Sequence, residues 1–287
     1  MREEWITAGG VPLLVRSAGS GSAIICLHGF PESGASWAAQ LASLGAAHQV
    51  LALDGRGHGR SGCPPKLDDY RIDRLVADVL AVADHHDAKR FALVGHDWGG
   101  VIAWCTAAWH PERVSQLVAI NAPHPTLLQA ALDEDPAQQR ASSYIAALTA
   151  PDAADRLTAD RLWELVFGAD EHRGLIGPAE KAQLLASWTR PRAISAMLSW
   201  YRAAPFDFAP VGGHGAGRLP APLRIAAPTL VLWGMDDTIL LPRLLTGLEE
   251  LVPDLAVRRV EGAGHGLVRE QPELVTRLIA DHLARAR

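Results

Sequence analysis

The sequence predicts an α/β fold: a mostly parallel, doubly wound sheet with an inserted helical cap. Short apolar runs alternate with helical patterns over residues 1–124, and the alternation resumes over residues 228–287. Residues 125–227 show helical patterns only. Alternating strands and helices favour a parallel sheet with right-handed crossovers. We therefore expect one core domain built from the two outer stretches and a cap built from the middle one.

The first ninety residues supply a hairpin, buried strands and helices. Alternation around a Gly-Gly pair indicates the hairpin, and continuous apolar runs indicate strands buried on both faces. Apolar residues at helical spacing place the last helix against the sheet. In order, these elements are a hairpin at residues 5–16, a strand at 23–28, a helix at 36–44, a strand at 49–53 and a helix at 70–84.

Residues 91–109 form the centre of the predicted fold. An apolar run ends in Gly95-His96-Asp97-Trp98-Gly99 and passes directly into a helical pattern. So sharp a turn needs glycine on both sides of its central residue, because neighbouring Cβ atoms would clash there. The helix N-terminus beside Asp97 favours negative charge. A lone Asp at such a place is usually a helix cap, but the flanking glycines favour a nucleophile.

The cap follows a strand at residues 114–120 and precedes the last part of the core. A Gly/Pro-rich run at 209–222 closes the cap as a loop. Helices inserted here should cover the carboxyl ends of the strands, where open α/β sheets bind ligands. We expect cap helices at residues 126–132, 136–148, 159–167, 178–188 and 191–201, then a strand at 229–233, a helix at 242–251, a strand at 256–260 and a helix at 272–284.

Composition argues against several classes of function. The chain is 48% apolar and 21% charged, as in globular proteins, and its net charge of −5 gives no electrostatic case for nucleic acid. No apolar run approaches the roughly 18 residues that cross a bilayer, and the N-terminus lacks the layout of a signal peptide. Three cysteines without CxxC spacing favour a reduced, cytoplasmic compartment. The histidines lack metal-ligand spacing, so we expect no metal and no cofactor.

Polar side chains follow three different predicted strands. Asp97 follows the strand of the central turn, Asp236 and Asp237 follow the strand at 229–233, and His265 follows the strand at 256–260 between glycines. The carboxyl ends of parallel strands meet at one edge of a sheet, so these side chains can converge. Their order along the chain is nucleophile, acid and base, which is the order of α/β-hydrolases.

At these residues the chain resembles the α/β-hydrolase superfamily, and within it most closely the epoxide hydrolases of the soluble type. The resemblance covers nearly the whole chain and implies an α/β-hydrolase fold. A Gly-x-Gly pair at residues 54–62 is by itself only a weak sign of phosphate binding, but it belongs to one of the matching motifs. These are HGFPES at residues 28–33, a DxRGxGxS loop at 54–61, the nucleophile elbow at 95–100, and a GHxxxxExP segment with His265, Glu270 and Pro272.

The resemblance also implies the catalytic roles. Asp97 would attack an epoxide carbon and form an ester. Two cap segments resemble those that supply tyrosines, so Tyr144 and Tyr201 would protonate the leaving oxygen. His265, oriented by an acid, would activate the water that hydrolyses the ester. We prefer Asp237 to Asp236 as this acid, because it lies three residues after Gly234 as in similar W-G-x-x-D segments, although Thr238 stands where the family often has proline.

The remaining predicted site residues would contact the substrate or stabilise the oxyanion that forms when water attacks the ester of Asp97. The main-chain N–H groups of Phe30 and Trp98 would form the oxyanion hole. Trp200, Pro31 and His96 are predicted to contact the substrate. Gly266 follows the base where relatives frequently have an aromatic residue, which would widen the pocket there. Four tryptophans are open to either a core or a pocket role: Trp104, Trp163, Trp188 and Trp200.

Two other functions are weighed against an epoxide hydrolase. Haloalkane or haloacid dehalogenases use the same Asp ester, but Phe30 stands where haloalkane dehalogenases have a halide-binding Asn, and Trp98 and Val101 stand where fluoroacetate dehalogenases have arginines. A non-catalytic ligand-binding protein of this fold would have a damaged triad, whereas all parts are present.

We expect the protein to bind a small apolar epoxide as substrate and to bind neither nucleic acid nor a membrane. Whether the chain forms a homodimer is left open.

Overall fold

An eight-stranded sheet forms the centre of the computed structural model, which describes residues 1–285. The strand order is β1-β2-β4-β3-β5-β6-β7-β8. β1 and β2 form the predicted antiparallel hairpin, β2 pairs antiparallel with β4, and all other pairs are parallel. The strands are β1 Arg2–Ala8, β2 Val11–Ala18, β3 Ala23–Leu27, β4 Gln49–Leu53, β5 Phe91–His96, β6 Val114–Ile120, β7 Thr229–Gly234 and β8 Leu255–Val260.

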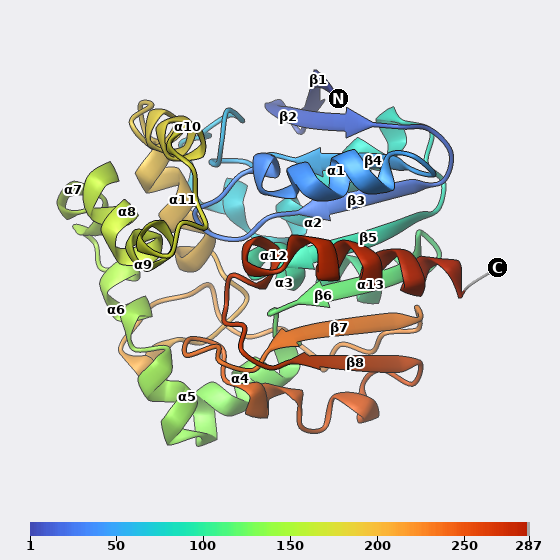
Figure 1. The fold of residues 1–287 in the computed structure, drawn as a ribbon. Helices are drawn as coiled ribbons and strands as arrows, with labels where there is room; N and C mark the ends of the chain where they lie inside the picture. The colour runs from blue at the N-terminus through green and yellow to red at the C-terminus, as the bar shows by residue number, and fades with distance from the viewer. Residues whose placement is uncertain (286–287) are drawn as a thin grey trace.

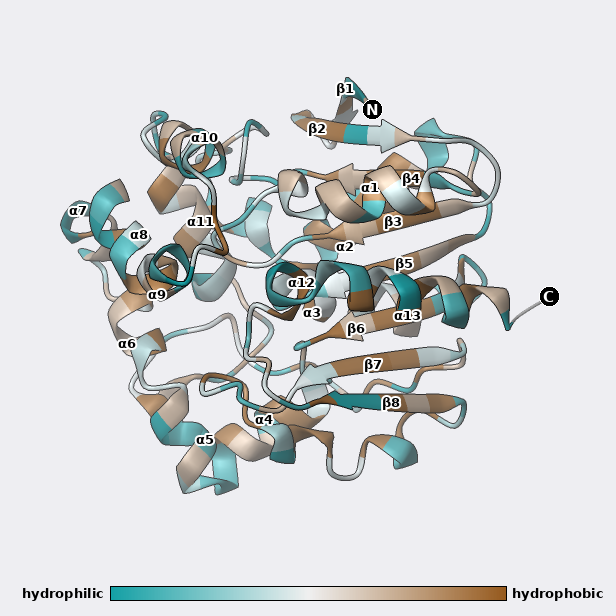
Figure 2. Cartoon of the chain, viewed as in Figure 1, coloured by the Kyte–Doolittle hydropathy of each residue, from teal (hydrophilic) through white to brown (hydrophobic). Residues whose placement is uncertain are grey.

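Helices cover both faces of the sheet (Figure 1). One face packs against α1 (Ala38–Leu44), α12 (Leu267–Glu270) and α13 (Pro272–Ala284), and the other against α2 (Ile72–His85) and α3 (Trp98–Trp109). β3, β5 and β7 are buried along their whole length, as their continuous apolar runs predict. Figure 2 shows these strands as the hydrophobic centre of the molecule. No helix in the described part of the chain has the length and apolar character of a membrane span.

The inserted helices gather beyond one end of the sheet (Figure 1). Several of them share a small apolar core of their own, which includes Trp163, Phe167 and Trp188. The boundaries of the cap at residues 125 and 227 stay a prediction. The helices are α4 Pro125–Glu134, α5 Pro136–Ala141, α6 Tyr144–Thr149, α7 Ala153–Arg156, α8 Ala159–Val166, α9 Gly168–His172, α10 Pro178–Trp188 and α11 Ala193–Arg202.

The prediction of one helix at residues 136–148 is wrong. The chain forms α5 and α6 instead, with a break at Ser142 and Ser143. Two serines stand at the break, and serine favours turns over helix interiors because its side chain competes for backbone hydrogen bonds. The side-chain amide of Gln138 in α5 donates to the carbonyl of Ile239 at 2.8 Å and accepts from the N–H of Leu241 at 3.0 Å, so the loop after β7 contacts α5.

The predicted helix at residues 242–251 is also wrong. Two short 3-10 helices, Pro242–Leu245 and Leu248–Glu250, occupy this segment. Gly247 separates them with φ of 82°, a conformation that glycine adopts without strain and that ends a helix. Three short helices were missed altogether: α7, α9 and α12. Further 3-10 turns lie at Gly34–Trp37, Leu67–Tyr70 and Ala209–Val211.

The glycine-rich loop at residues 54–62 folds around a carboxylate of the protein itself. Asp54 is fully buried and accepts from the N–H groups of Gly34 at 2.8 Å and Arg60 at 2.9 Å, and it pairs with Arg16. A Cβ on Gly59 would lie 2.2 Å from this carboxylate. The glycines therefore serve the close packing of the loop on Asp54, which accounts for the Gly-x-Gly pair without a phosphate.

Candidate active site

Asp97 lies at a strained turn between β5 and α3. Its φ of 51° and ψ of −122° are rare for a residue with a side chain, and such strain is typical of functional sites. The surrounding glycines permit the turn: a Cβ on Gly99 would lie 2.2 Å from the carbonyl oxygen of Leu27. The Asp97 side chain makes no capping hydrogen bond to α3. The helix-cap interpretation therefore fails, and the carboxylate is free to face the cavity.

The loop after β3 contacts this carboxylate directly. The main-chain N–H of Phe30 donates to Oδ1 of Asp97 at 2.9 Å. Gly29 makes the approach possible, because a Cβ there would lie 2.7 Å from the same oxygen. Trp98, the second predicted donor, begins α3 beside Asp97; within residues 1–285 its N–H makes no hydrogen bond to the carboxylate. One of the two predicted oxyanion donors is thus already aimed at the reacting group.

His265 lies between two carboxylates. Its Nε2 is 3.6 Å from Oδ2 of Asp97, and its Nδ1 is 2.8 Å from Oδ2 of Asp237. Asp237 is fully buried, and its other oxygen accepts from the N–H groups of Ile239 and Leu240, each at 2.9 Å. Between the two adjacent acids, Asp237 is therefore the one that contacts the histidine.

Electrostatics within this group favour a charged imidazole on His265 beside the carboxylate of Asp237. Burial by itself lowers the pKa of His265, but Asp237 and then Asp97 outweigh it and hold the pKa well above its ordinary value. Burial likewise raises the pKa of Asp237, yet attraction to His265 and the hydrogen bonds from His265, Leu240 and Asn121 lower it below its usual range. Both directions favour an ionised Asp237–His265 pair.

Two residues that sequence reasoning did not assign complete this arrangement. Asn121, directly after β6, is fully buried with φ of 40°. It donates to Oδ2 of Asp237 at 2.8 Å and accepts from the N–H of Gly234 at 3.0 Å. Glu270 accepts from the N–H of Gly264 at 3.1 Å and so closes the loop that carries His265. Glu270 was part of a predicted motif, whereas Asn121 carried no signal except its place after a strand.

Two cap tyrosines face Asp97 across a cavity. Tyr201 on α11 is buried. Tyr144 on α6 is 37% exposed as a whole residue, but its phenol group is enclosed by the protein, and the two ring centroids are 6.3 Å apart. Burial raises the pKa of both phenols, and the negative charge of Asp97 raises it further, so both stay protonated at neutral pH. The empty space is about 410 Å³, part of it open to solvent. Its apolar lining includes Val101, Leu128, Ile145, Phe206, Phe208 and Leu240.

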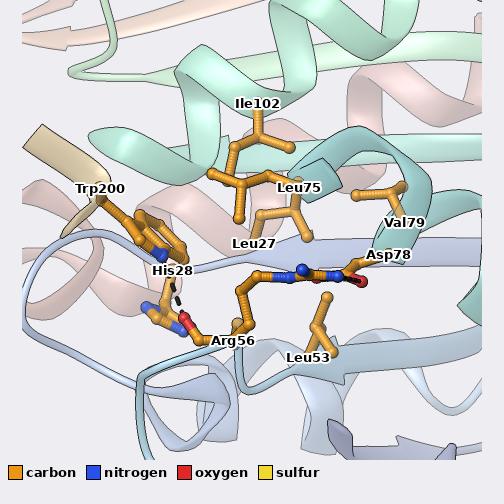
Figure 3. A pocket seen from close by; sticks show the side chains of 10 residues that line it. Leu27, His28, Leu53, Arg56, Leu75, Asp78, Val79, Ile102 and Trp200 are labelled. Atoms are coloured by element: carbon orange, nitrogen blue, oxygen red, sulfur yellow. Dashed lines mark hydrogen bonds and ion pairs between the residues drawn. The ribbon is translucent and has the colours of Figure 1, made fainter. Parts of the chain in front are cut away.

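The three predicted substrate contacts lie elsewhere. Trp200 donates its indole N–H to the carbonyl of Arg56 at 3.0 Å and stacks near His28, beside a separate internal pocket (Figure 3). Pro31 accepts from the indole of Trp188 at 3.0 Å. His96 lies behind the base, with Nε2 2.8 Å from the carbonyl oxygen of His265. None of the three lines the cavity at Asp97.

The four tryptophans whose role was open have core positions. Trp163 and Trp188 belong to the cap core, Trp104 donates to the carbonyl of Ala122 at 3.1 Å, and Trp200 joins cap to core.

The described residues form no metal site: within residues 1–285 no group of three His, Cys, Asp or Glu side chains is placed to hold an ion.

An aspartate at a strained strand–helix elbow, with a histidine and a second aspartate after later strands of the same sheet, defines a site of the α/β-hydrolase class. The chain belongs to this family, because the family model for the alpha/beta hydrolase fold matches residues 22–272. A similar protein is the AB hydrolase superfamily protein YfhM of Bacillus subtilis, at 31% identity over 98% of this chain and 97% of that protein.

Several of the similar proteins are named as epoxide hydrolases. Epoxide hydrolase 4 of Mus musculus is 29% identical over 97% of this chain and 75% of that protein. The structure of a point mutant of an epoxide hydrolase from Bacillus megaterium is similar with a TM-score of 0.90 at 30% identity, over 98% of this chain and 100% of that one. An epoxide hydrolase from metagenomes of hot environments has a TM-score of 0.88 at 34% identity, over 99% and 98%.

Proposed function

We propose that this protein is an epoxide hydrolase that converts a small apolar epoxide into a vicinal diol through an ester of Asp97. One observation carries the proposal: a single carboxylate is held by the Phe30 N–H on one oxygen and lies 3.6 Å from His265 on the other, opposite two protonated tyrosines. The relatives named as epoxide hydrolases support the same reaction.

In the first step Oδ2 of Asp97 attacks an epoxide carbon. The carbon–oxygen bond of the ring breaks, and the leaving oxygen takes a proton from Tyr144 or Tyr201. The raised pKa of these phenols keeps the proton available at neutral pH. An apolar cavity suits this step, because it excludes water and strengthens the interaction of the phenols with the leaving oxygen. The product is a hydroxyalkyl ester of Asp97.

In the second step water attacks the carbonyl carbon of that ester. Esterification removes the charge of Asp97, which is one of the two charges that raise the pKa of His265. The imidazole can then give up its proton, which by way of water restores the tyrosine that was deprotonated in the first step. The neutral imidazole accepts a proton from the attacking water, while Asp237 stabilises the charge that returns. The Phe30 N–H donates to the oxyanion, a contribution of about 3 kcal/mol for one donor in comparable reactions. Collapse releases the diol and restores the carboxylate.

The test is to trap the ester. Styrene oxide is mixed with the protein and quenched within milliseconds, and the mass of the peptide that contains Asp97 is measured. We expect an increase by one substrate molecule, transient in the wild type and persistent in His265→Gln. Asp97→Asn is the matched control and should give neither adduct nor diol.

Isotope labelling separates ester hydrolysis from direct attack of water on the epoxide. In a single turnover in ¹⁸O-labelled water, the diol should be unlabelled and Asp97 should carry the label. Labelled diol with unlabelled Asp97 would contradict the ester route. No adduct and no diol from a panel of aromatic, fatty-acid and polycyclic epoxides would contradict the proposed activity itself.

A further inference from the structure

The loop that carries His265 is short and is anchored in the core by the buried side chains of Ala263, Leu267 and Val268. It runs from the end of β8 to α13 and includes α12. Within the loop, Glu270 holds the N–H of Gly264 at 3.1 Å. From the core, Nε2 of His96 lies 2.8 Å from the carbonyl oxygen of His265. The position of the imidazole therefore depends on what holds residues 264–270.

The cap contacts this loop through ion pairs. Asp170 of α9 lies 3.2 Å from Arg269, and Arg173, which follows α9, lies 3.3 Å from Glu270. Glu180 of α10 lies 3.8 Å from Arg269. These contacts fall four and five residues after the base, on the residues that shape its loop.

The Asp170–Arg269 pair is largely shielded from water, whereas the Arg173–Glu270 pair is shielded on the Glu270 side only. The exposed fractions are 11% for the Arg269 side chain, 17% for Asp170 and 7% for Glu270, but 54% for Arg173. The guanidinium of Arg269 also lies over the ring of Phe167, 4.7 Å from its centroid, and pairs with Glu32 of the core. Shielded charges at these distances interact more strongly than exposed ones, whose pairs contribute little.

Gly266, next to His265, lies against these ion pairs. A Cβ at Gly266 would lie 3.5 Å from a carboxylate oxygen of Asp170 and equally far from one of Glu270, which is an ordinary contact distance. The carboxylate of Asp170 in the cap is therefore close to the residue that follows His265.

We propose that the α9–α10 segment of the cap positions the catalytic base, with Asp170 and Arg173 as positioning residues that act through Arg269 and Glu270. This role rests on the proposed function. The tyrosines that serve the first step lie on α6 and α11, and Asp97 is held by the core. Loss of the ion pairs should therefore slow hydrolysis of the ester and leave its formation unchanged.

The experiment compares four proteins with styrene oxide in rapid-quench single turnovers: wild type, a test protein, a control and Arg173→Lys. The test protein carries Asp170→Asn and Arg173→Gln. The control carries Arg156→Gln, which breaks the exposed cap pair with Asp152 (3.0 Å) far from the loop. Arg269 itself is left intact, because its removal would strand the shielded carboxylates of Glu32 and Asp170 and endanger folding.

We expect the test protein to hydrolyse the ester about tenfold or more slowly, since small displacements of a catalytic group have effects of this size. Ester formation should stay within about twofold of wild type, so the adduct accumulates. Arg156→Gln should match wild type in both steps. Arg173→Lys with Asp170 retained should recover most of the hydrolysis rate, because the charge remains.

Hydrogen exchange supplies a readout that does not depend on activity. Peptides that cover residues 261–271 should exchange faster in the test protein than in wild type or in Arg156→Gln. Unchanged exchange together with unchanged hydrolysis would overturn the positioning role. Parallel slowing of both chemical steps would overturn it too, because it indicates a general structural defect. Faster exchange without any adduct in the wild type would instead refute the epoxide hydrolase activity and leave the loop contact established.

Discussion

The side-chain amide of Asn121 lies 2.8 Å from Oδ2 of Asp237, the same oxygen that accepts from His265. Asn121 therefore fixes the carboxylate in the orientation that holds the base. The side-chain oxygen Oδ1 of Asn121 accepts from the N–H of Gly234 at 3.0 Å, so both the nitrogen and the oxygen of the amide are hydrogen-bonded. β6 thus contributes to the site without supplying a reacting group.

Asn121→Ala should lower both stability and the second chemical step. Loss of the amide leaves the buried N–H of Gly234 unpaired and removes a donor from Asp237, which should reduce the free energy of unfolding by about 1–3 kcal/mol. Ester hydrolysis should slow about tenfold, with ester formation little affected. Denaturant unfolding and single-turnover kinetics measure the two effects. Wild-type hydrolysis in a stable variant would show that Asp237 needs no such support.

Tyr144→Phe and Tyr201→Phe should each slow ester formation about tenfold to a hundredfold, and the double variant should lose more, because general acid catalysis contributes roughly 10²–10⁴ in rate. Rapid-quench measurement of the adduct gives the rate. Tyr70, the third tyrosine, donates to the carbonyl of Pro64 away from the cavity, so Tyr70→Phe is the control. Unchanged alkylation in both cap variants would assign their phenols to packing alone.

Hydrolysis of the ester should be slow at low pH and rise to a plateau as pH increases. Burial opposes the charge on His265 but Asp237 and Asp97 raise its pKa, and the protonated imidazole cannot accept a proton from water. Below the pKa that applies in the ester form, the adduct should therefore accumulate. Ester formation should show no alkaline loss up to about pH 10, because the tyrosine pKa values are raised above their ordinary value of about 10. Rapid-quench single turnovers between pH 5 and 10 measure the rates of ester hydrolysis and ester formation. Hydrolysis that is independent of pH would exclude His265 as the base.

Asp78→Ala should destabilise the protein strongly. Asp78 and Arg56 form a buried pair, 4% exposed or less, with contacts of 2.5 and 2.7 Å (Figure 3). Removal of one partner from such a pair costs about 3–5 kcal/mol, because a buried charge is left unpaired. Arg56→Met combined with Asp78→Leu should restore most of the stability. Thermal unfolding of the three variants measures this, and an equal loss in the double variant would contradict it.

Much of the fold, and the grouping of Asp97, Asp237 and His265, could be predicted from the sequence. Strands buried on both faces read as continuous apolar runs, and β4 and β6 begin and end at the predicted residues. The elbow around Asp97 was evident because only glycine tolerates its close contacts. Where local signals were weak the predictions failed: no glycine or proline marks the break between α5 and α6, and only two serines stand there.

The sequence by itself determined which side chains follow which strands, and parallel strands bring Asp97, Asp237 and His265 to one edge whatever the details of packing. Only the tertiary structure decided where the side chains point: Trp200 toward the loop at Arg56, His96 toward the carbonyl of His265, and Asn121 toward Asp237. Only the tertiary structure likewise decided the ion pairs between the α9 region and the loop that carries His265. Such directions depend on contacts between segments far apart in the chain, and neither propensity nor periodicity records those contacts.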